Sequence, residues 1–200
     1  MSDSVYENTA LEEAEGKKSV FQKFSVKDVI FMAILSAAAL CTAAVMAVVS
    51  HVYVFGLAQL VTAFQFSIFP AIALCKIRKP GTLMFFAFFT GLFELFMAPV
   101  MFVSSVLTGL ILEALVILIW RGYEKNAAVF FASLLYIPCT LPFNLLYYRL
   151  FSKEMMELFF KDGFKWLSVV FIAGTFAVSA LGSFLGIKVS KELKKAGVLK

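Results

Sequence analysis

The sequence predicts an all-α, polytopic membrane protein: a bundle of six transmembrane helices with both termini in the cytoplasm. Three observations support this prediction. Hydrophobic residues make up 62% of the chain and charged residues only 16%, against about 25% in soluble domains. The apolar residues form runs of about 20, the length at which a helix crosses a bilayer. Basic residues lie between these runs, as topology signals do.

The N-terminal segment, residues 1–24, is polar and rich in glutamate, so we expect it to be disordered in the cytoplasm. Its acidic start, with no short apolar core and cleavage site, is not typical of a signal peptide. Ser25-Val-Lys-Asp28 has the pattern of a capping box and predicts that the first helix begins there.

Six spans follow within a transmembrane domain that we place at 25–188. Their expected bounds are 27–50, 56–76, 81–98, 103–120, 127–148 and 165–187. Short hinges separate most of them, whereas 149–164 is a longer connection. Its Met155, Leu158 and Phe159 predict a short amphipathic helix on the membrane surface. Residues 189–200 form a basic tail that we expect in the cytoplasm.

The basic residues set the orientation. Of the 18 Lys and Arg residues, 14 lie in segments expected on the cytoplasmic side and four in segments expected outside. Cytoplasmic loops carry such an excess, so the count favours six spans with both ends in the cytoplasm. We expect a bacterial plasma membrane as the location.

Prolines interrupt two of these spans, at Pro70 and at Pro138 and Pro142. Proline removes a backbone donor, so we expect kinks there. A kink can be purely structural, or it can open a cavity between the helices.

Two acids lie well inside expected spans, Glu94 in the third and Glu113 in the fourth. A charged side chain inside a bilayer is costly, so both should face the bundle interior. Glu94 falls in the outer part of its span and Glu113 near mid-membrane or somewhat below. Each is either a structural carboxyl that ties helices together or a ligand-binding acid, suited to a cationic or amino-bearing solute.

Other polar candidates for substrate binding lie at the outer depth. Gln59 and Gln65 belong to the second span, and Asn144, Tyr147 and Tyr148 to the fifth. Asn144 shares a helix face with the two tyrosines, at i+3 and i+4. The tyrosines also fit an interfacial aromatic belt, but an amide that faced lipid would leave its hydrogen bonds unmade.

No catalytic, metal or cofactor site is predicted. His51 is the single histidine, which excludes a histidine pair, and the three cysteines are too far apart in sequence for a Cys-x-x-Cys motif. No glycine-rich phosphate loop is visible. We therefore predict neither an enzyme nor a nucleic-acid-binding protein.

Small residues recur at intervals of four in two spans. Ala33 and Ala37 lie in the first span, and the sixth has the pairs Gly182 and Gly186, and Ser179 and Ser183. Such stripes let helices approach closely. They pack either within the chain's own bundle or against another membrane subunit.

These features together resemble the substrate-binding S-component of an energy-coupling factor vitamin transporter. Its hydroxymethylpyrimidine or thiamine-precursor branch is the most similar. The resemblance rests on the Ala33-Ile-Leu-Ser-Ala37 spacing, on Ile77-Arg-Lys-Pro-Gly81 followed by Glu94, on Gly109-Leu-Ile-Leu-Glu113, and on the tail Ser190–Leu199.

The resemblance implies that the chain captures a vitamin or vitamin precursor on the outer side. Ala33 and Ala37 would dock on a transmembrane coupling subunit, which two ATPase subunits drive, and Glu94 and Glu113 would match acids of that branch. The residues leave two alternatives open: a self-sufficient small secondary transporter, and a membrane-embedded enzyme or assembly scaffold.

Overall fold

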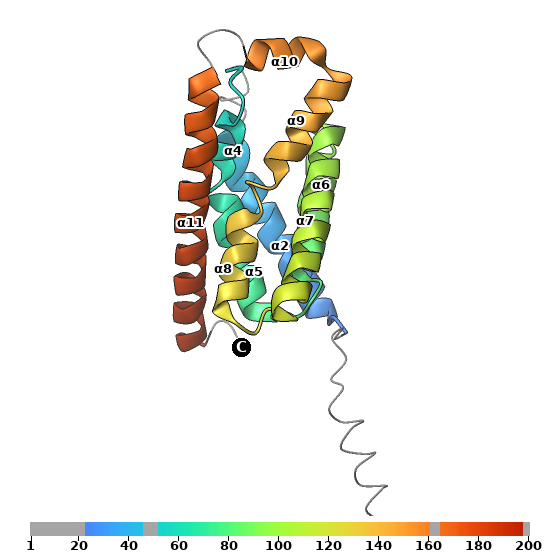
Figure 1. Ribbon diagram of the computed structural model, residues 1–200. Coiled ribbons are helices and arrows are strands. Elements are labelled where there is room, and N and C mark those ends of the chain that lie inside the picture. The colour runs from blue at the N-terminus through green and yellow to red at the C-terminus, as the bar shows by residue number, and fades with distance from the viewer. Residues whose placement is uncertain (1–22, 46–51, 161–164, 198–200) are drawn as a thin grey trace, which may run out of the picture.

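The computed structural model describes residues 23–45, 52–160 and 165–197, and this part of the chain is helical throughout, without strands (Figure 1). The first helix, α2, spans Val26–Thr42 and is followed by a 3₁₀ turn, η1, at Ala43–Val45. The predicted capping box is confirmed: the Asp28 N–H donates to Ser25 Oγ over 3.2 Å, and the Ser25 N–H donates to Asp28 Oδ2 over 3.0 Å. Residues 1–22, which we expected to be disordered, lie outside the described residues. Positions 46–50 of the first expected span lie outside them as well.

The second predicted span is two helices, α4 (Leu57–Thr62) and α5 (Gln65–Ile77). The break falls at Ala63 and Phe64, not at Pro70 as we expected. Pro70 lies inside α5, in its second turn. Proline there removes one intrahelical hydrogen bond, to the carbonyl four residues before, and α5 continues past it.

The third and fourth spans are α6 (Thr82–Glu94) and α7 (Pro99–Trp120). Helix α7 begins four residues before the expected 103, with Pro99 in its first turn. Proline is favoured there because the first helical N–H has no intrahelical acceptor.

The fifth span is also broken, into α8 (Asn126–Leu135) and α9 (Thr140–Phe151). Pro138 lies in the break, as the prolines predicted, and Pro142 lies in the first turn of α9. The predicted short helix between the last two spans is α10 (Lys153–Phe159), and the final helix, α11, spans Lys165–Lys195. Part of the predicted tail, 189–195, therefore continues α11.

Three segments are long and apolar enough to cross a membrane: Pro99–Trp120, Asn126–Phe151 (α8 with α9) and Lys165–Lys195. Helices α5 and α6 are apolar but shorter. The membrane character of the chain is thus visible in its helices. The six-span topology and the cytoplasmic termini remain predictions.

Helix α5 forms the centre of the bundle. It packs against α2, α6, α8 and α11, and nine of its 13 residues are buried. Helix α11 approaches it closely at the small-residue stripe, where a Cβ built on Gly182 would lie 2.7 Å from the Phe64 carbonyl oxygen. Ser179 and Ser183 are buried in α11 as well. The sequence leaves two alternatives open for this small-residue stripe of α11. The structure shows the first of them, packing within the chain's own bundle.

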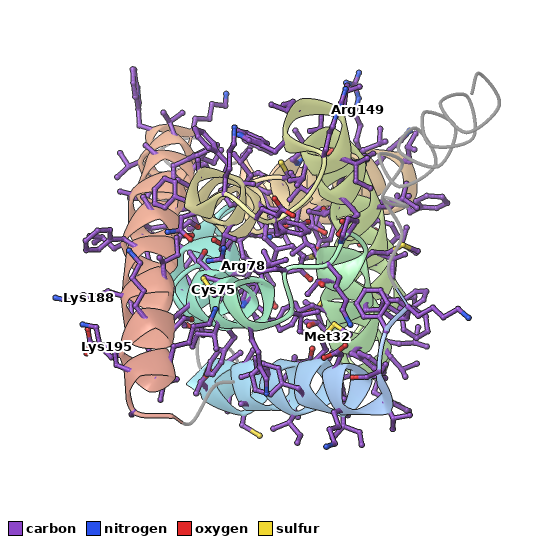
Figure 2. The ribbon with its side chains drawn as sticks, turned by 90° about the horizontal axis from the view of Figure 1, so that it is seen from below. Met32, Cys75, Arg78, Arg149, Lys188 and Lys195 are labelled. Carbon is purple, nitrogen blue, oxygen red and sulfur yellow. The ribbon has the colours of Figure 1, made fainter. Side chains whose placement is uncertain are left out.

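Polar contacts tie the elements together at one end of the bundle, which we call the basic end: the start of α2, the turns 78–81 and 121–125, and the last turns of α11 (Figure 1). The Arg78 guanidinium donates to the Glu124 carbonyl over 2.6 Å, and Lys194 Nζ donates to the Cys75 carbonyl over 2.8 Å. Lys79 pairs with Asp28 at 2.7 Å. Viewed from this end, Arg78 and Cys75 lie inside the ring of helices, while Lys188 and Lys195 point outward (Figure 2).

Candidate functional site: a closed-ended pocket opposite the basic end

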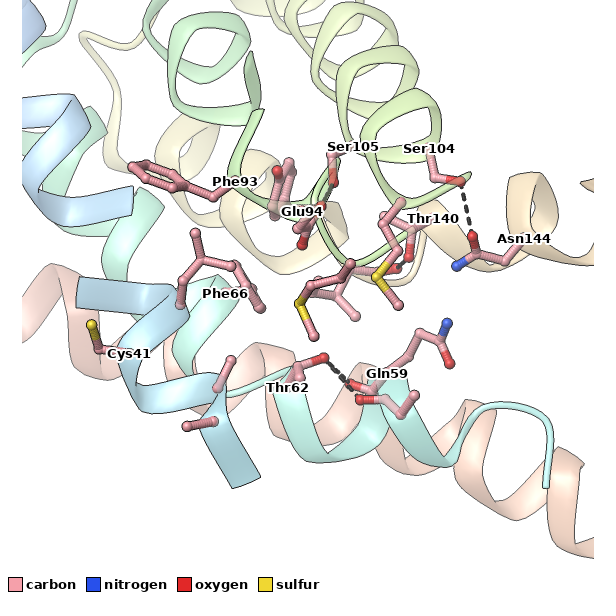
Figure 3. Close-up of a pocket in the computed structure, with 18 of the residues that line it drawn as sticks. Cys41, Gln59, Thr62, Phe66, Phe93, Glu94, Ser104, Ser105, Thr140 and Asn144 are labelled. Atoms are coloured by element: carbon pink, nitrogen blue, oxygen red, sulfur yellow. Dashed lines mark hydrogen bonds between the residues drawn. The ribbon is translucent and has the colours of Figure 1, made fainter. Parts of the chain in front are cut away.

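A pocket of about 460 Å³ lies in the half of the bundle away from the basic end (Figure 3). Side chains of α2, η1, α4, α5, α6, α7 and α9 line it, together with residues of the α6–α7 turn and of the break that precedes α9. Its volume falls within the range of about 300–1,000 Å³ that is usual for small-molecule sites. Its lining comprises Ala37, Leu40, Cys41, Ala43, Ala44, Ala58, Gln59, Thr62, Phe66, Phe93, Glu94, Met97, Met101, Ser104, Ser105, Tyr136, Ile137, Thr140 and Asn144.

Glu94 is the one acid in this lining. It is the last residue of α6, and the α6–α7 turn brings Ser105 against it. The Ser105 hydroxyl donates to Glu94 Oε2 over 2.5 Å, whereas Glu94 Oε1 has no hydrogen bond within the described chain. One carboxyl oxygen is therefore held by the protein, and the other remains able to accept a hydrogen bond.

Tyr136 forms part of the same wall, at the break between α8 and α9. Its side chain is only 1% exposed, and its hydroxyl finds no hydrogen-bond partner among the described residues. The hydroxyls of Ser105 and Thr90 lie near it, but each donates its own hydrogen elsewhere, to Glu94 and to the Phe86 carbonyl respectively, so neither donates to Tyr136. A buried hydroxyl without a partner is costly, so this wall carries an unsatisfied polar group.

Two amides face the pocket from opposite helices. Asn144 in α9 accepts a hydrogen bond of 2.8 Å from Ser104 in α7 through its Oδ1, and Gln59 projects from α4 toward the same space (Figure 3). The Nδ2 group of Asn144 and the Gln59 amide are thus left for other partners. Both amides are partly buried and line the cavity.

Large apolar side chains make up most of the remaining wall: Phe66, Phe93, Met97 and Met101. Methionine is flexible and polarisable, so this wall can adapt to the shape of a bound molecule. A mostly apolar pocket with a few convergent polar groups is the usual form of a small-molecule site.

Glu113 occupies a different part of the protein. Its carboxyl accepts hydrogen bonds from the backbone N–H groups of Gly81 (2.6 Å), Leu83 (3.1 Å) and Met84 (3.4 Å), and from the Tyr123 hydroxyl (3.0 Å). It therefore caps the N-terminus of α6 near the basic end and does not line the pocket. The structure favours the structural alternative for this acid.

Three other predicted binding residues also lie outside the lining: Gln65, Tyr147 and Tyr148. Tyr147 contacts Phe151, with ring centroids 5.2 Å apart, and Tyr148 contacts Phe159 in α10 at 5.0 Å. Gln65 is the first residue of α5. Of the seven predicted binding residues, the structure brings Glu94, Gln59 and Asn144 together around one cavity.

The two predicted docking alanines differ in position. Ala37 lines the pocket, whereas Ala33 does not. Both are partly buried on α2, beside Ser36, which donates to the Phe86 carbonyl over 3.3 Å. A substitution at Ala37 would thus change the pocket as well as the helix surface.

Sequence reasoning missed five polar lining residues: Thr62, Ser104, Ser105, Tyr136 and Thr140. One signal was available for Ser105. Glu94 and Ser105 flank a short turn that starts a new helix at a proline, and such a helical hairpin places the end of one helix beside the start of the next. Tyr136 could not be found this way, because its position depends on where the fifth span breaks.

The fold and the pocket define the class: an all-helical protein with membrane-type helices and a small-molecule-sized cavity at one end. Comparisons with protein-family models, with curated proteins and with solved structures found no match. In the described residues no group of three His, Cys, Asp or Glu side chains is placed to hold a metal ion.

Proposed function

We propose that this chain is a membrane-embedded solute-binding subunit, the S-component of an ATP-driven importer. The observation that carries the proposal is the pocket itself: a cavity of about 460 Å³ that brings Glu94, Gln59 and Asn144 together in a mostly apolar wall. It lies opposite the basic end, which under the positive-inside rule faces the cytoplasm. A pocket so placed receives its solute from outside the cell.

The resemblance described above supplies the rest of the proposal. It implies a vitamin or vitamin precursor of the thiamine or hydroxymethylpyrimidine type as solute, and three partner subunits: a transmembrane coupling protein and two ATPases. In this arrangement Ala33 contributes to the docking face on α2, since a close helix crossing tolerates only small side chains.

Affinity purification in a mild detergent tests the assembly. The tagged chain should co-elute with a membrane protein and with ATPase subunits, and Ala33→Trp should release them while the purified chain keeps its thermal stability. Ala33 is the better position for this test, because Ala37 also lines the pocket. Recovery of the chain alone, from wild type and variant alike, would contradict the proposal.

A second candidate is a self-sufficient secondary transporter. The observation that favours it is that two segments break beside the pocket, at 63–64 and at 136–139. Discontinuous helices around a central site are characteristic of such transporters. Solute uptake by the purified chain alone in liposomes would support this candidate over the first.

A further inference from the structure

We infer that the ligand of this pocket is a small organic cation, whose N–H group donates to the free oxygen of Glu94 while its apolar body packs between Phe66, Phe93 and the two methionines. This inference rests on the proposed function and narrows its substrate to a chemical class. It follows from three features of the lining.

The first feature is the charge of the lining. Glu94 is its one ionisable acid, and none of the lining residues in the described chain is Lys, Arg or His. An anionic ligand would face this carboxyl with no compensating positive charge, in a low-dielectric setting that strengthens the repulsion. A cation there instead replaces the hydration that the carboxylate lost on burial. The lining therefore disfavours carboxylate and phosphate ligands.

The second feature is the geometry of the carboxyl. Ser105 holds Oε2 and so orients the group, while Oε1 has no hydrogen bond in the described chain. A carboxylate oxygen accepts most strongly from a charged N–H donor. Figure 3 shows Phe66, Phe93 and Glu94 around one space, so an ammonium at Oε1 would also lie near aromatic rings, which attract cations.

The third feature is the distribution of the other polar groups. Gln59 and Asn144 face the same cavity from α4 and α9, and both are uncharged. An amide can donate or accept a hydrogen bond, so these two side chains can bind a neutral polar substituent of the ligand. Most of the remaining lining is apolar, with the hydroxyls of Ser104 and Ser105 held by Asn144 and Glu94. The matching ligand has a cationic end, an apolar body and a neutral polar group.

A matched set of three probes tests this inference: 4-methylbenzylamine, 4-methylbenzyl alcohol and 4-methylbenzoate. They share one ring and differ in charge. Saturation-transfer NMR would measure their dissociation constants with the full chain in nanodiscs, with empty nanodiscs to subtract lipid partitioning. We expect the amine to bind about 10-fold more tightly than the alcohol, since a charged donor roughly doubles the hydrogen-bond strength, and the benzoate to bind weakest.

Substitutions test whether Glu94 causes the tighter binding of the amine. Glu94→Gln should bind amine and alcohol equally, whereas Glu124→Gln, an exposed acid at the basic end, should keep the wild-type ratio. Glu94→Asp keeps the negative charge but moves it away from the cavity, because the aspartate side chain is one methylene shorter. This variant should bind the amine more weakly than wild type does and still bind it more tightly than the alcohol. This variant keeps the test decisive if Glu94→Gln does not fold.

Two sets of outcomes overturn the inference in different ways. If the alcohol or the benzoate binds as tightly as the amine, or if the amine preference survives in Glu94→Gln, the cavity takes solutes but not cations, and the proposed function stands. If none of the three probes binds, the inferred ligand class is wrong, and the co-purification experiment described above decides the proposed function separately.

Discussion

At the scale of single residues, the two acids of the expected spans show how one chemical group serves two purposes. Glu113 meets three backbone N–H groups at the start of α6 and the Tyr123 hydroxyl, so its oxygens are occupied by the protein. Glu94 meets one serine hydroxyl and a cavity. What separates them is the number of donors nearby.

Glu113→Gln should therefore act on stability and leave the pocket intact. The amide carries an NH₂ group in place of an acceptor oxygen and cannot accept all four of these hydrogen bonds, so we expect a loss of about 1–3 kcal/mol in the free energy of unfolding. Thermal unfolding in detergent would measure it, with Glu124→Gln as the exposed control. A drop in ligand binding at unchanged stability would instead place Glu113 in a binding role.

Tyr136 supports a second prediction at this scale. Its hydroxyl is buried without a hydrogen bond among the described residues, which costs about 1–3 kcal/mol. Tyr136→Phe removes that group and keeps the ring, so the variant should be at least as stable as wild type. Tyr147→Phe, whose ring contacts lie outside the lining, is the matched control. A clear loss of stability in Tyr136→Phe alone would show that the hydroxyl is paired.

At the scale of elements, the contact between α5 and α11 depends on the absence of side chains. A Cβ on Gly186 would lie 2.7 Å from both Ala71 Cβ and the Ile68 carbonyl oxygen, whereas one on Gly174 would meet a Leu60 methyl group at 3.0 Å. A backbone oxygen in a packed helix cannot move aside easily, but the end of a leucine side chain can. The two glycines of the same helix thus differ in what surrounds them.

Gly186→Ala should destabilise the protein by about 1–3 kcal/mol, the usual cost of overpacking, although alanine is the better helix former. Gly174→Ala should be close to neutral, because its gain in helix propensity offsets a small adjustment of Leu60. The difference between the two unfolding temperatures is the measurement. Equal values for both variants would mean that α11 does not approach α5 as described.

At the scale of the whole molecule, the two ends of the bundle differ in chemistry. The basic end is closed by hydrogen bonds between turns that are distant in sequence, such as Arg78 with Glu124 and with Asn126. The other half holds the pocket, beside the breaks of the second and fifth spans. Hydrogen bonds between residues far apart in sequence hold the basic end together, whereas the cavity lies beside two breaks in the helices.

Cysteine labelling tests how this arrangement sits in the membrane. In a background without native cysteines, Lys153→Cys in α10 should react with an impermeant thiol reagent in intact cells, and Lys125→Cys only after permeabilisation. Both positions are exposed, which 78–80 are not. The reverse labelling pattern would overturn the six-span topology and place the pocket on the cytoplasmic side.

The sequence alone determined the class of fold and predicted the direction of each segment, because apolar run length and charge placement are local properties. Hydropathy marked every helix-forming region, Ser25 and Asp28 marked the first helix start, and Glu94, Gln59 and Asn144 were singled out as polar groups in apolar surroundings. The tertiary structure decided which polar groups share a space. Whether Glu113 meets a helix N-terminus, or Tyr136 and Ser105 meet Glu94, depends on helix breaks and on the rotation of packed helices, which residues far apart in sequence set together.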